Sequence, residues 1–113
     1  MKPTIKPFRE FARRAKRLKK KFQLLDDDLR EFALSLTEKP HQGDSLGGGL
    51  YKIRLGSASK GGGKRGGFRI ITYYVEQTAA GEVVYLVTIY DKSEEANILK
   101  ADLLNTIQTE LGQ

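Results

Sequence analysis

The sequence predicts an α+β domain in which two N-terminal helices pack on a small antiparallel sheet and a short C-terminal helix closes the chain. Apolar residues recur every three or four positions before Pro40, which indicates helices. Alternating, β-branched and aromatic residues dominate between residues 51 and 90, which indicates strands. Because helical and strand segments are separated along the chain, we expect the helices to gather on one face of the sheet.

The first helix is predicted over residues 9–21. Its apolar positions are spaced by three and four and form one stripe: Phe8, Phe11, Ala15, Leu18 and Phe22. Lys and Arg fill most other positions: Arg9, Arg13, Arg14, Lys16, Arg17, Lys19, Lys20 and Lys21. Such a helix can lie along a phosphate backbone or accept an acidic protein partner, and the plainer alternative is a solvated face.

A second helix is predicted to begin near residues 26–28 and to end before Pro40. The three aspartates there suit the positive end of a helix dipole, and Asp28 with Glu31 has capping-box spacing. Because capping explains these carboxylates, a metal cluster is the weaker interpretation. The single histidine, His41, is expected in a surface loop.

Three strands are predicted, over residues 51–55, 68–75 and 83–90, with a turn at residues 79–81 between the last two. A short initial strand over residues 2–6 is also compatible with the sequence. Ser93 is expected to cap a helix that has Glu94 and Glu95 in its first turn. The apolar residues of this closing helix are Leu99, Leu103, Leu104, Ile107 and Leu111.

Size and charge narrow the function. The 113 residues suit one domain over residues 1–113, and the net charge of +6 favours a polyanionic partner, either nucleic acid or an acidic protein segment. The absence of cysteine and the single histidine exclude disulfides, thiolate nucleophiles and Cys-based or multi-His metal sites, so we expect no metal and no cofactor. No segment is apolar enough for a membrane span or signal peptide, which makes the cytoplasm the expected location.

A basic stretch without any acidic residue runs over residues 45–75. Its cations are Lys52, Arg54, Lys60, Lys64, Arg65 and Arg69. On two strands and the loop between them they would form a surface suited to phosphate. The glycines at 61, 63 and 66 match a dinucleotide-binding pattern, but a strand follows them instead of a helix, so that interpretation fails.

Residues 50–55, 66–74 and 86–93, with the basic run at 16–21, resemble the RelE-like toxins of the HigB group, in the RelE/ParE superfamily. The resemblance implies the mRNA interferase fold and the toxin of a type II toxin–antitoxin system. It also implies cleavage of translated mRNA, commonly in the ribosomal A site, and inhibition by a cognate antitoxin, a DNA-binding protein. The implied chemistry is metal-independent attack of a ribose 2′-hydroxyl on the adjacent phosphate, which needs only proton transfer and cations.

By the same resemblance, Arg69 stabilises the phosphate, and the alternative is a surface arginine whose stem covers apolar neighbours. Arg54 lies on the neighbouring predicted strand and is expected to hold the phosphate. Lys60 or Lys64 is the base, and crowding by like charge would have to lower its pKa from about 10.4. Tyr90 stacks on a base or donates a proton. The expected RNA-binding residues are Lys52, Arg65 and Lys92.

Two alternatives remain open at this point. One is a non-catalytic module that binds RNA, the ribosome or DNA through the same basic surface. The other is a ParE-like toxin, which shares the fold and acts on DNA gyrase. The ParE-like alternative is disfavoured because a gyrase inhibitor needs no phosphate-cleaving cluster. The cations of that cluster are Lys52, Arg54, Lys64 and Arg69.

Overall fold

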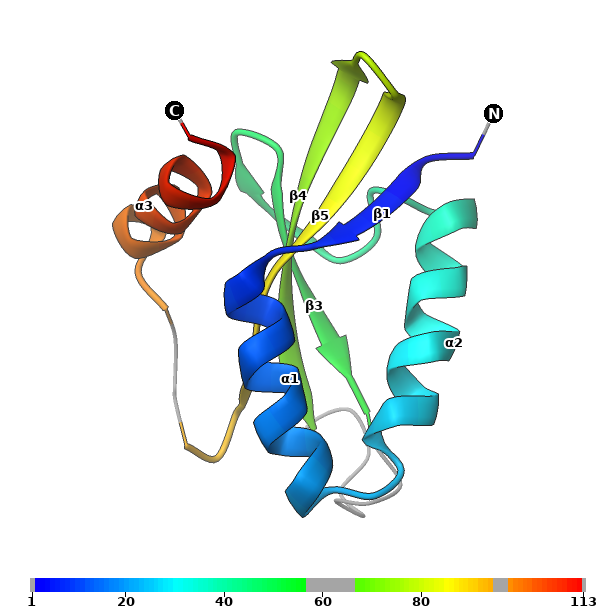
Figure 1. Ribbon diagram of the computed structural model, residues 1–113, viewed down its shortest axis with the longest axis vertical. Coiled ribbons are helices and arrows are strands. Elements are labelled where there is room, and N and C mark those ends of the chain that lie inside the picture. Colours follow the sequence, from blue (N-terminus) through cyan, green and yellow to red (C-terminus); the bar gives the residue numbers. More distant parts are fainter. Residues whose placement is uncertain (1, 57–66, 95–97, 113) are drawn as a thin grey trace.

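The computed structural model describes residues 2–56, 67–94 and 98–112. Figure 1 shows an α+β arrangement, as the sequence predicts, with helices on both sides of one twisted sheet. The elements are, in chain order, β1 (Thr4–Pro7), α1 (Arg9–Lys21), α2 (Leu25–Glu38), β2 (Asp44–Gly47), β3 (Leu50–Leu55), β4 (Phe68–Thr78), β5 (Gly81–Asp91) and α3 (Lys100–Leu111).

The sheet has the strand order β1-β5-β4-β3-β2. The three predicted strands form its centre and are antiparallel, whereas β1 runs parallel to β5 at one edge. The initial strand is therefore confirmed, slightly later than residues 2–6. β2 was not predicted; it has four residues and forms a hairpin with β3 through Gly48 and Gly49, both at positive φ.

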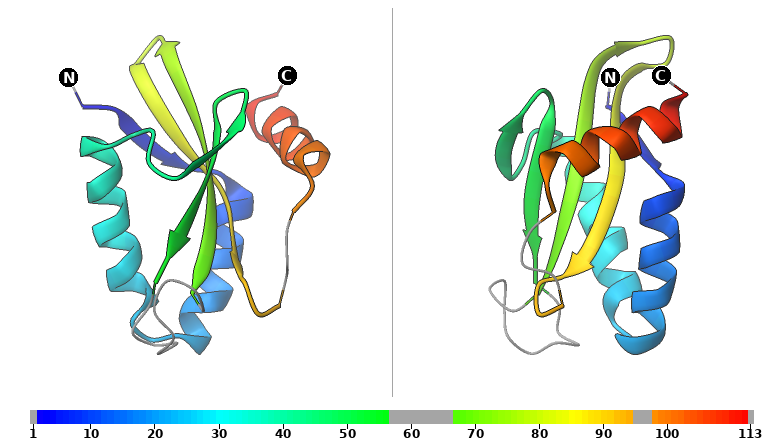
Figure 2. Two further views of the ribbon diagram at one scale, coloured as in Figure 1. Left: turned by 180° about the vertical axis from the view of Figure 1, so that it is seen from behind. Right: turned by 90° about the vertical axis from the view of Figure 1, so that its left-hand side faces the viewer.

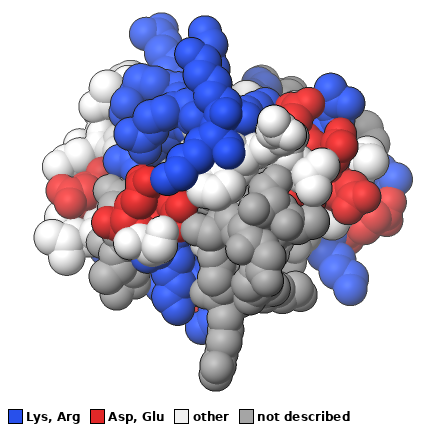
Figure 3. All heavy atoms as spheres, turned by 90° about the horizontal axis from the view of Figure 1, so that it is seen from below, with Lys and Arg blue, Asp and Glu red and all other residues white. Residues whose placement is uncertain are grey.

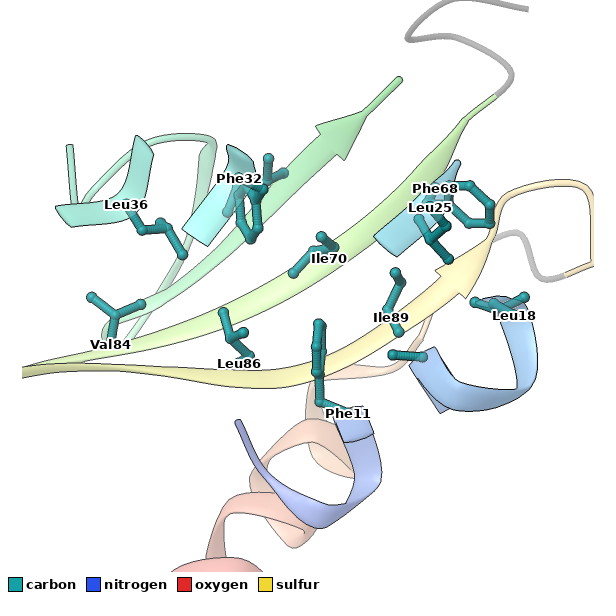
Figure 4. Close-up of a cluster of buried hydrophobic side chains, with 12 residues drawn as sticks. Phe11, Leu18, Leu25, Phe32, Leu36, Phe68, Ile70, Val84, Leu86 and Ile89 are labelled. Atoms are coloured by element: carbon teal, nitrogen blue, oxygen red, sulfur yellow. The ribbon is translucent and has the colours of Figure 1, made fainter. Parts of the chain in front are cut away.

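A first core lies between the sheet and the helices α1 and α2. The apolar stripe of α1 contributes Phe11, Ala15 and Leu18, as its spacing predicts. Figure 4 shows Phe11 and Leu18 on the side of α1 that faces the sheet. They meet Phe32 and Leu36 of α2 and the strand residues Ile53, Phe68, Ile70, Val84, Leu86 and Ile89.

A second core lies on the opposite face of the sheet, beneath α3. It consists of Phe8, Leu50, Ile71, Val87, Leu103 and Ile107. The two further views in Figure 2 show the sheet between α2 and α3. The expected gathering of helices on one face therefore holds for α1 and α2, and α3 departs from it because its buried residues Leu103 and Ile107 cover the other face.

α2 starts one residue before the predicted region 26–28, but the capping box inferred from Asp28 and Glu31 is not formed. α2 begins at Leu25, and the preceding Leu24 has no side chain that can cap it. The aspartates lie in the first turn, where they still suit the helix dipole. The carboxylate of Asp26 also forms two ion pairs at 2.9 Å, one with Lys19 of α1 and one with Arg30 in the next turn of α2. The pair with Lys19 links the two helices.

Ser93 does not cap a helix. It lies in a turn after β5, where its backbone N–H and hydroxyl donate to Oδ1 of Asp91 at 2.9 and 2.8 Å. α3 begins only at Lys100, after Leu99. Asp and Ser two residues apart form a turn of this kind as readily as a helix cap, so the pattern did not by itself indicate a helix.

Candidate functional site

Three of the expected site residues lie in one row across the sheet. The strand register pairs Arg54 of β3 with Arg69 of β4, and Arg69 with Tyr90 of β5. Because directly paired residues project from the same face, their side chains are neighbours. This row, called the Arg54–Arg69–Tyr90 row below, lies on the face opposite α1 and α2. Lys52 lies in the next row on the same face, paired with Ile71.

The residues of this row and the neighbouring Lys52 differ in their exposure to solvent. Arg54 is exposed and Lys52 is half-buried, whereas Arg69 is 5% and Tyr90 2% exposed. A guanidinium nitrogen of Arg69 donates to the carbonyl oxygen of Phe68 at 3.3 Å. The alternative of Arg69 as a surface residue that covers apolar neighbours is therefore wrong. A buried guanidinium with fixed geometry can present its charge in one direction only.

Gly67 brings the ends of three strands together next to this row. A Cβ at Gly67 would clash with the carbonyl oxygen of Leu55, so only glycine lets β3 and β4 approach this closely. The carbonyl oxygen of Gly67 also accepts a hydrogen bond from the backbone N–H of Lys92 at 3.4 Å. The glycine before Arg69 thus has a structural role that positions the row.

The turn after β5 carries Lys92, which is exposed at the same end of the sheet. The preceding Asp91 is 2% exposed and holds this turn through its two hydrogen bonds from Ser93. Asp91 is not among the site residues expected from the sequence, although the Asp-x-Ser pattern was its signal. Lys60, Lys64 and Arg65 lie outside the described residues.

Positive charge continues from this end of the sheet onto α1. Figure 3 views the molecule from below and shows Lys and Arg gathered on one part of that face. The exposed cations of α1 are Arg9, Arg13, Lys16, Arg17, Lys19, Lys20 and Lys21. Nζ of Lys21 lies 3.6 Å from the carboxylate of Glu94, just beyond Lys92, so the C-terminal end of α1 adjoins this turn.

The N-terminal half of α1 is partly neutralised. Glu10 accepts hydrogen bonds from both Arg13 and Arg14. Burial alone would raise the pKa of Glu10, but these two arginines outweigh burial and hold the pKa below its usual value. The uncompensated charge of α1 therefore belongs mainly to its C-terminal half.

Within residues 2–56, 67–94 and 98–112, no three His, Asp or Glu side chains come together as a metal site would require. None of the helices in these ranges is long and apolar enough to cross a membrane.

A profile of the RelE toxin family, described as the RelE toxin of the RelE/RelB toxin–antitoxin system, matches residues 8–110. The match spans all three helices and four of the five strands, and the fold is that of a RelE-like protein. The chain therefore belongs to the RelE toxin family. It is the toxin of a toxin–antitoxin system, which implies a cognate antitoxin as its partner.

Proposed function

We propose that this toxin is an mRNA endonuclease that cleaves translated messages, with the ribosome as the place of cleavage. The observation that supports this most is the Arg54–Arg69–Tyr90 row, with Lys52 beside it and Lys92 in the adjoining turn. The row joins two guanidinium groups and one phenol on adjacent strands. Cations and a proton donor are what phosphodiester cleavage without a protein nucleophile requires.

The proposed reaction is an attack of the ribose 2′-hydroxyl oxygen on the adjacent phosphorus. A base removes the proton of that hydroxyl, a P–O bond forms, and the bond from phosphorus to the 5′-oxygen breaks. The departing 5′-oxygen takes up a proton, which leaves a 2′,3′-cyclic phosphate and a 5′-hydroxyl. The phosphorane passed on the way carries extra negative charge, and fixed cations stabilise it more than they stabilise the starting phosphodiester.

Each residue has a proposed role in this reaction. Arg54 and Lys52 hold the phosphate, and Arg69 stabilises the charge that develops on it. Tyr90 protonates the leaving oxygen or stacks on a base. Because Arg69 and Tyr90 are buried, RNA reaches them only when the groups that cover them move aside.

The residues outside the described ranges complete the proposal. Lys60 or Lys64 acts as the base, and Arg65 binds RNA together with Lys92. We further propose that residues 1–113 act as a single domain in the cytoplasm, and that the cognate antitoxin is a DNA-binding protein. No cofactor takes part.

Primer extension on mRNA after induction of the toxin tests the proposal. New 5′ ends inside translated codons are expected with the native chain. Arg54→Ala should reduce them about a hundredfold or more if Arg54 contacts the reacting phosphate. Arg30→Ala is the matched control, because Arg30 is an exposed arginine on α2 and its loss should leave cleavage unchanged. Unaltered messages after induction of a toxic native chain would contradict the proposal.

A further inference from the structure

Lys100 is a cation that the candidate site does not yet include, and the fold places it against the sheet. It is the first residue of α3 and lies three positions before the buried Leu103, so the two side chains share one side of the helix. Leu103 belongs to the same core as Leu50 of β3. A Cβ on Gly47 of β2 would lie only 3.2 Å from Nζ of Lys100. The ammonium group therefore rests on the β2–β3 hairpin.

The strand register brings this ammonium group into line with two cations of the candidate site. Gly47 pairs with Leu50, so Lys100 lies over that pair. Leu50, Lys52 and Arg54 are alternate residues of β3 and face the same way, on the side of the sheet that α3 covers. Positive charge therefore follows β3 through three successive rows, which belong to Arg54, Lys52 and Lys100.

The spacing of these rows suits a single strand of nucleic acid. Alternate residues of a strand are about 7 Å apart, which is close to the separation of neighbouring phosphates in an extended single strand. A cavity of about 410 Å³ lies beside Lys52 and Arg54 and leaves room for a phosphate group. Asp44 is the one carboxylate that lines this cavity, so its two cations outnumber it. The line of cations can hold one phosphate for each row.

The position of Lys100 does not favour a role in stabilising α3. The first turn of a helix carries the positive end of the helix dipole, where a cation is unfavourable. Lys100 is exposed, and within residues 2–56, 67–94 and 98–112 no carboxylate forms an ion pair with it. A cation that opposes the dipole and has no carboxylate partner in these ranges is suited to bind an anion from outside the chain.

We infer that Lys100 is a further RNA-binding residue, and that the bound single strand runs along β3, with Arg54, Lys52 and Lys100 on successive phosphates. The strand then continues from the Arg54–Arg69–Tyr90 row toward the β2–β3 hairpin, away from the turn that carries Lys92. The inference rests on the Proposed function only in taking single-stranded RNA as the ligand.

The test measures the affinity of each variant for a single-stranded RNA oligonucleotide with 2′-O-methyl groups, which lacks the attacking hydroxyl of the proposed reaction. Fluorescence anisotropy gives the dissociation constant over a range of salt concentrations. We expect Lys100→Gln to weaken binding about two- to fivefold at low salt, as the loss of one exposed ion pair would. The slope of the logarithm of affinity against that of salt concentration should become shallower by about 0.7, as for one phosphate contact.

Lys39→Gln is the matched control, because Lys39 is an exposed lysine at the end of α2 and its loss lowers the net charge equally. It should change neither the affinity nor the slope. Lys100→Arg keeps the charge and should keep both quantities near their native values. Equal losses for Lys100→Gln and Lys39→Gln, or a loss for Lys100→Arg as large as that for Lys100→Gln, would overturn the inference.

The thermal midpoint separates binding from folding. Lys100→Gln should leave it unchanged or slightly higher, because the change removes a cation from the start of a helix. A lower midpoint together with the loss of affinity would indicate a structural role and overturn the inference.

Cleavage of translated mRNA separates this inference from the Proposed function. A chain that cuts no message but loses affinity as expected in Lys100→Gln would contradict the Proposed function and support the inference. A chain that cuts messages and binds RNA equally well with and without Lys100 would do the reverse.

Discussion

Arg69 is the residue whose chemistry and burial are most closely linked. Its guanidinium is buried at the centre of the Arg54–Arg69–Tyr90 row, so its removal takes away both a cation and a packed side chain. We expect Arg69→Ala to lower the cleavage rate by about 10² to 10³. Arg69→Lys should recover little of this loss, because one ammonium cannot reproduce the planar set of donors.

The measurement must separate catalysis from folding, because a buried charge can matter for both. Cleavage is therefore compared at equal concentrations of folded chain, with circular dichroism as the check, and binding of the antitoxin serves as a second sign of intact structure. A folded Arg69→Ala chain that cleaves at the native rate would remove Arg69 from the site and leave Arg54 and Lys52 as its cations.

Gly67 lies where β3 and β4 pack closely, and replacing it tests that packing. A Cβ at this position clashes with the carbonyl oxygen of Leu55, and the backbone of β3 cannot move without disturbing its pairing with β4. Gly67→Ala should therefore lower the free energy of unfolding by about 1–3 kcal/mol. Gly48→Ala is the control for crowding, since nothing lies within 4 Å of a Cβ there, although its φ of +63° carries a cost of its own. Urea denaturation measures both, and a Gly67 variant as stable as the native chain would contradict the expectation.

At the scale of whole elements, α1 depends on a residue from the other end of the chain. Phe8 cannot cap the helix, and the carboxylate of Glu110 in α3 instead accepts the backbone N–H groups of Arg9 and Glu10, both at 3.1 Å. Glu110→Ala should lower the free energy of unfolding by about 0.5–2 kcal/mol. Gln108→Ala, at an exposed position of the same helix, should change it by less than about 0.5 kcal/mol. Equal thermal midpoints for the two variants would refute the capping role.

The β4–β5 hairpin carries a pH-dependent contact. The hydroxyl of Tyr74 donates to the carboxylate of Glu82, and this hydrogen bond, more than burial, raises the pKa of Tyr74 to about 12. Because the folded pKa lies above the unfolded value of 10.0, the contact contributes its full stability below pH 10 and loses it as the pH rises toward 12. An absorbance titration should show one tyrosine ionising near pH 12, and Tyr74→Phe should abolish that step. A native chain without such a step would disprove the assignment.

The elements that the sequence predicted well have local patterns. The stripe from Phe11 to Leu18 fixes both the bounds and the buried face of α1, and the alternation around Ile53 fixes the face of β3. The same alternation placed Lys52 and Arg54 together, and the register then added Arg69. The features that the sequence did not predict depend on distant partners: β2 pairs only with β3, and the residue that caps α1 is Glu110 of α3.

The burial of Arg69 and Tyr90 is a further feature that no local pattern reveals. Arginine followed by an isoleucine pair is typical of a half-exposed strand, yet both faces of this sheet are covered. On the second face, Leu103 and Ile107 of α3 pack against Ile71 and Val87.

For the whole molecule, the positions of the cations matter more for RNA binding than the net charge of +6. Arg17, Lys20 and Lys21 surround Glu94 in one shallow cavity, next to the turn that carries Lys92. Figure 3 shows Lys and Arg gathered in one patch with carboxylates beside it, and the ion pair of Lys21 with Glu94 places the basic end of α1 next to the turn that carries Lys92. RNA that enters the site should pass along α1 and release counterions there as well.

The position of α1 next to this turn predicts a specific salt dependence. The logarithm of RNA affinity should fall linearly with the logarithm of salt concentration, by about 0.7 for each phosphate contacted on a single strand. If Arg17 and Lys20 each contact one phosphate, the double variant Arg17→Gln/Lys20→Gln should reduce this slope by about 1.4. The same double change at Lys6 and Lys39, exposed residues of β1 and of the end of α2, lowers the net charge equally and should leave the slope almost unchanged. Fluorescence anisotropy with an RNA oligonucleotide over a range of salt measures all three slopes. Equal reductions in both variants would mean that net charge, and not the location of α1, governs the association.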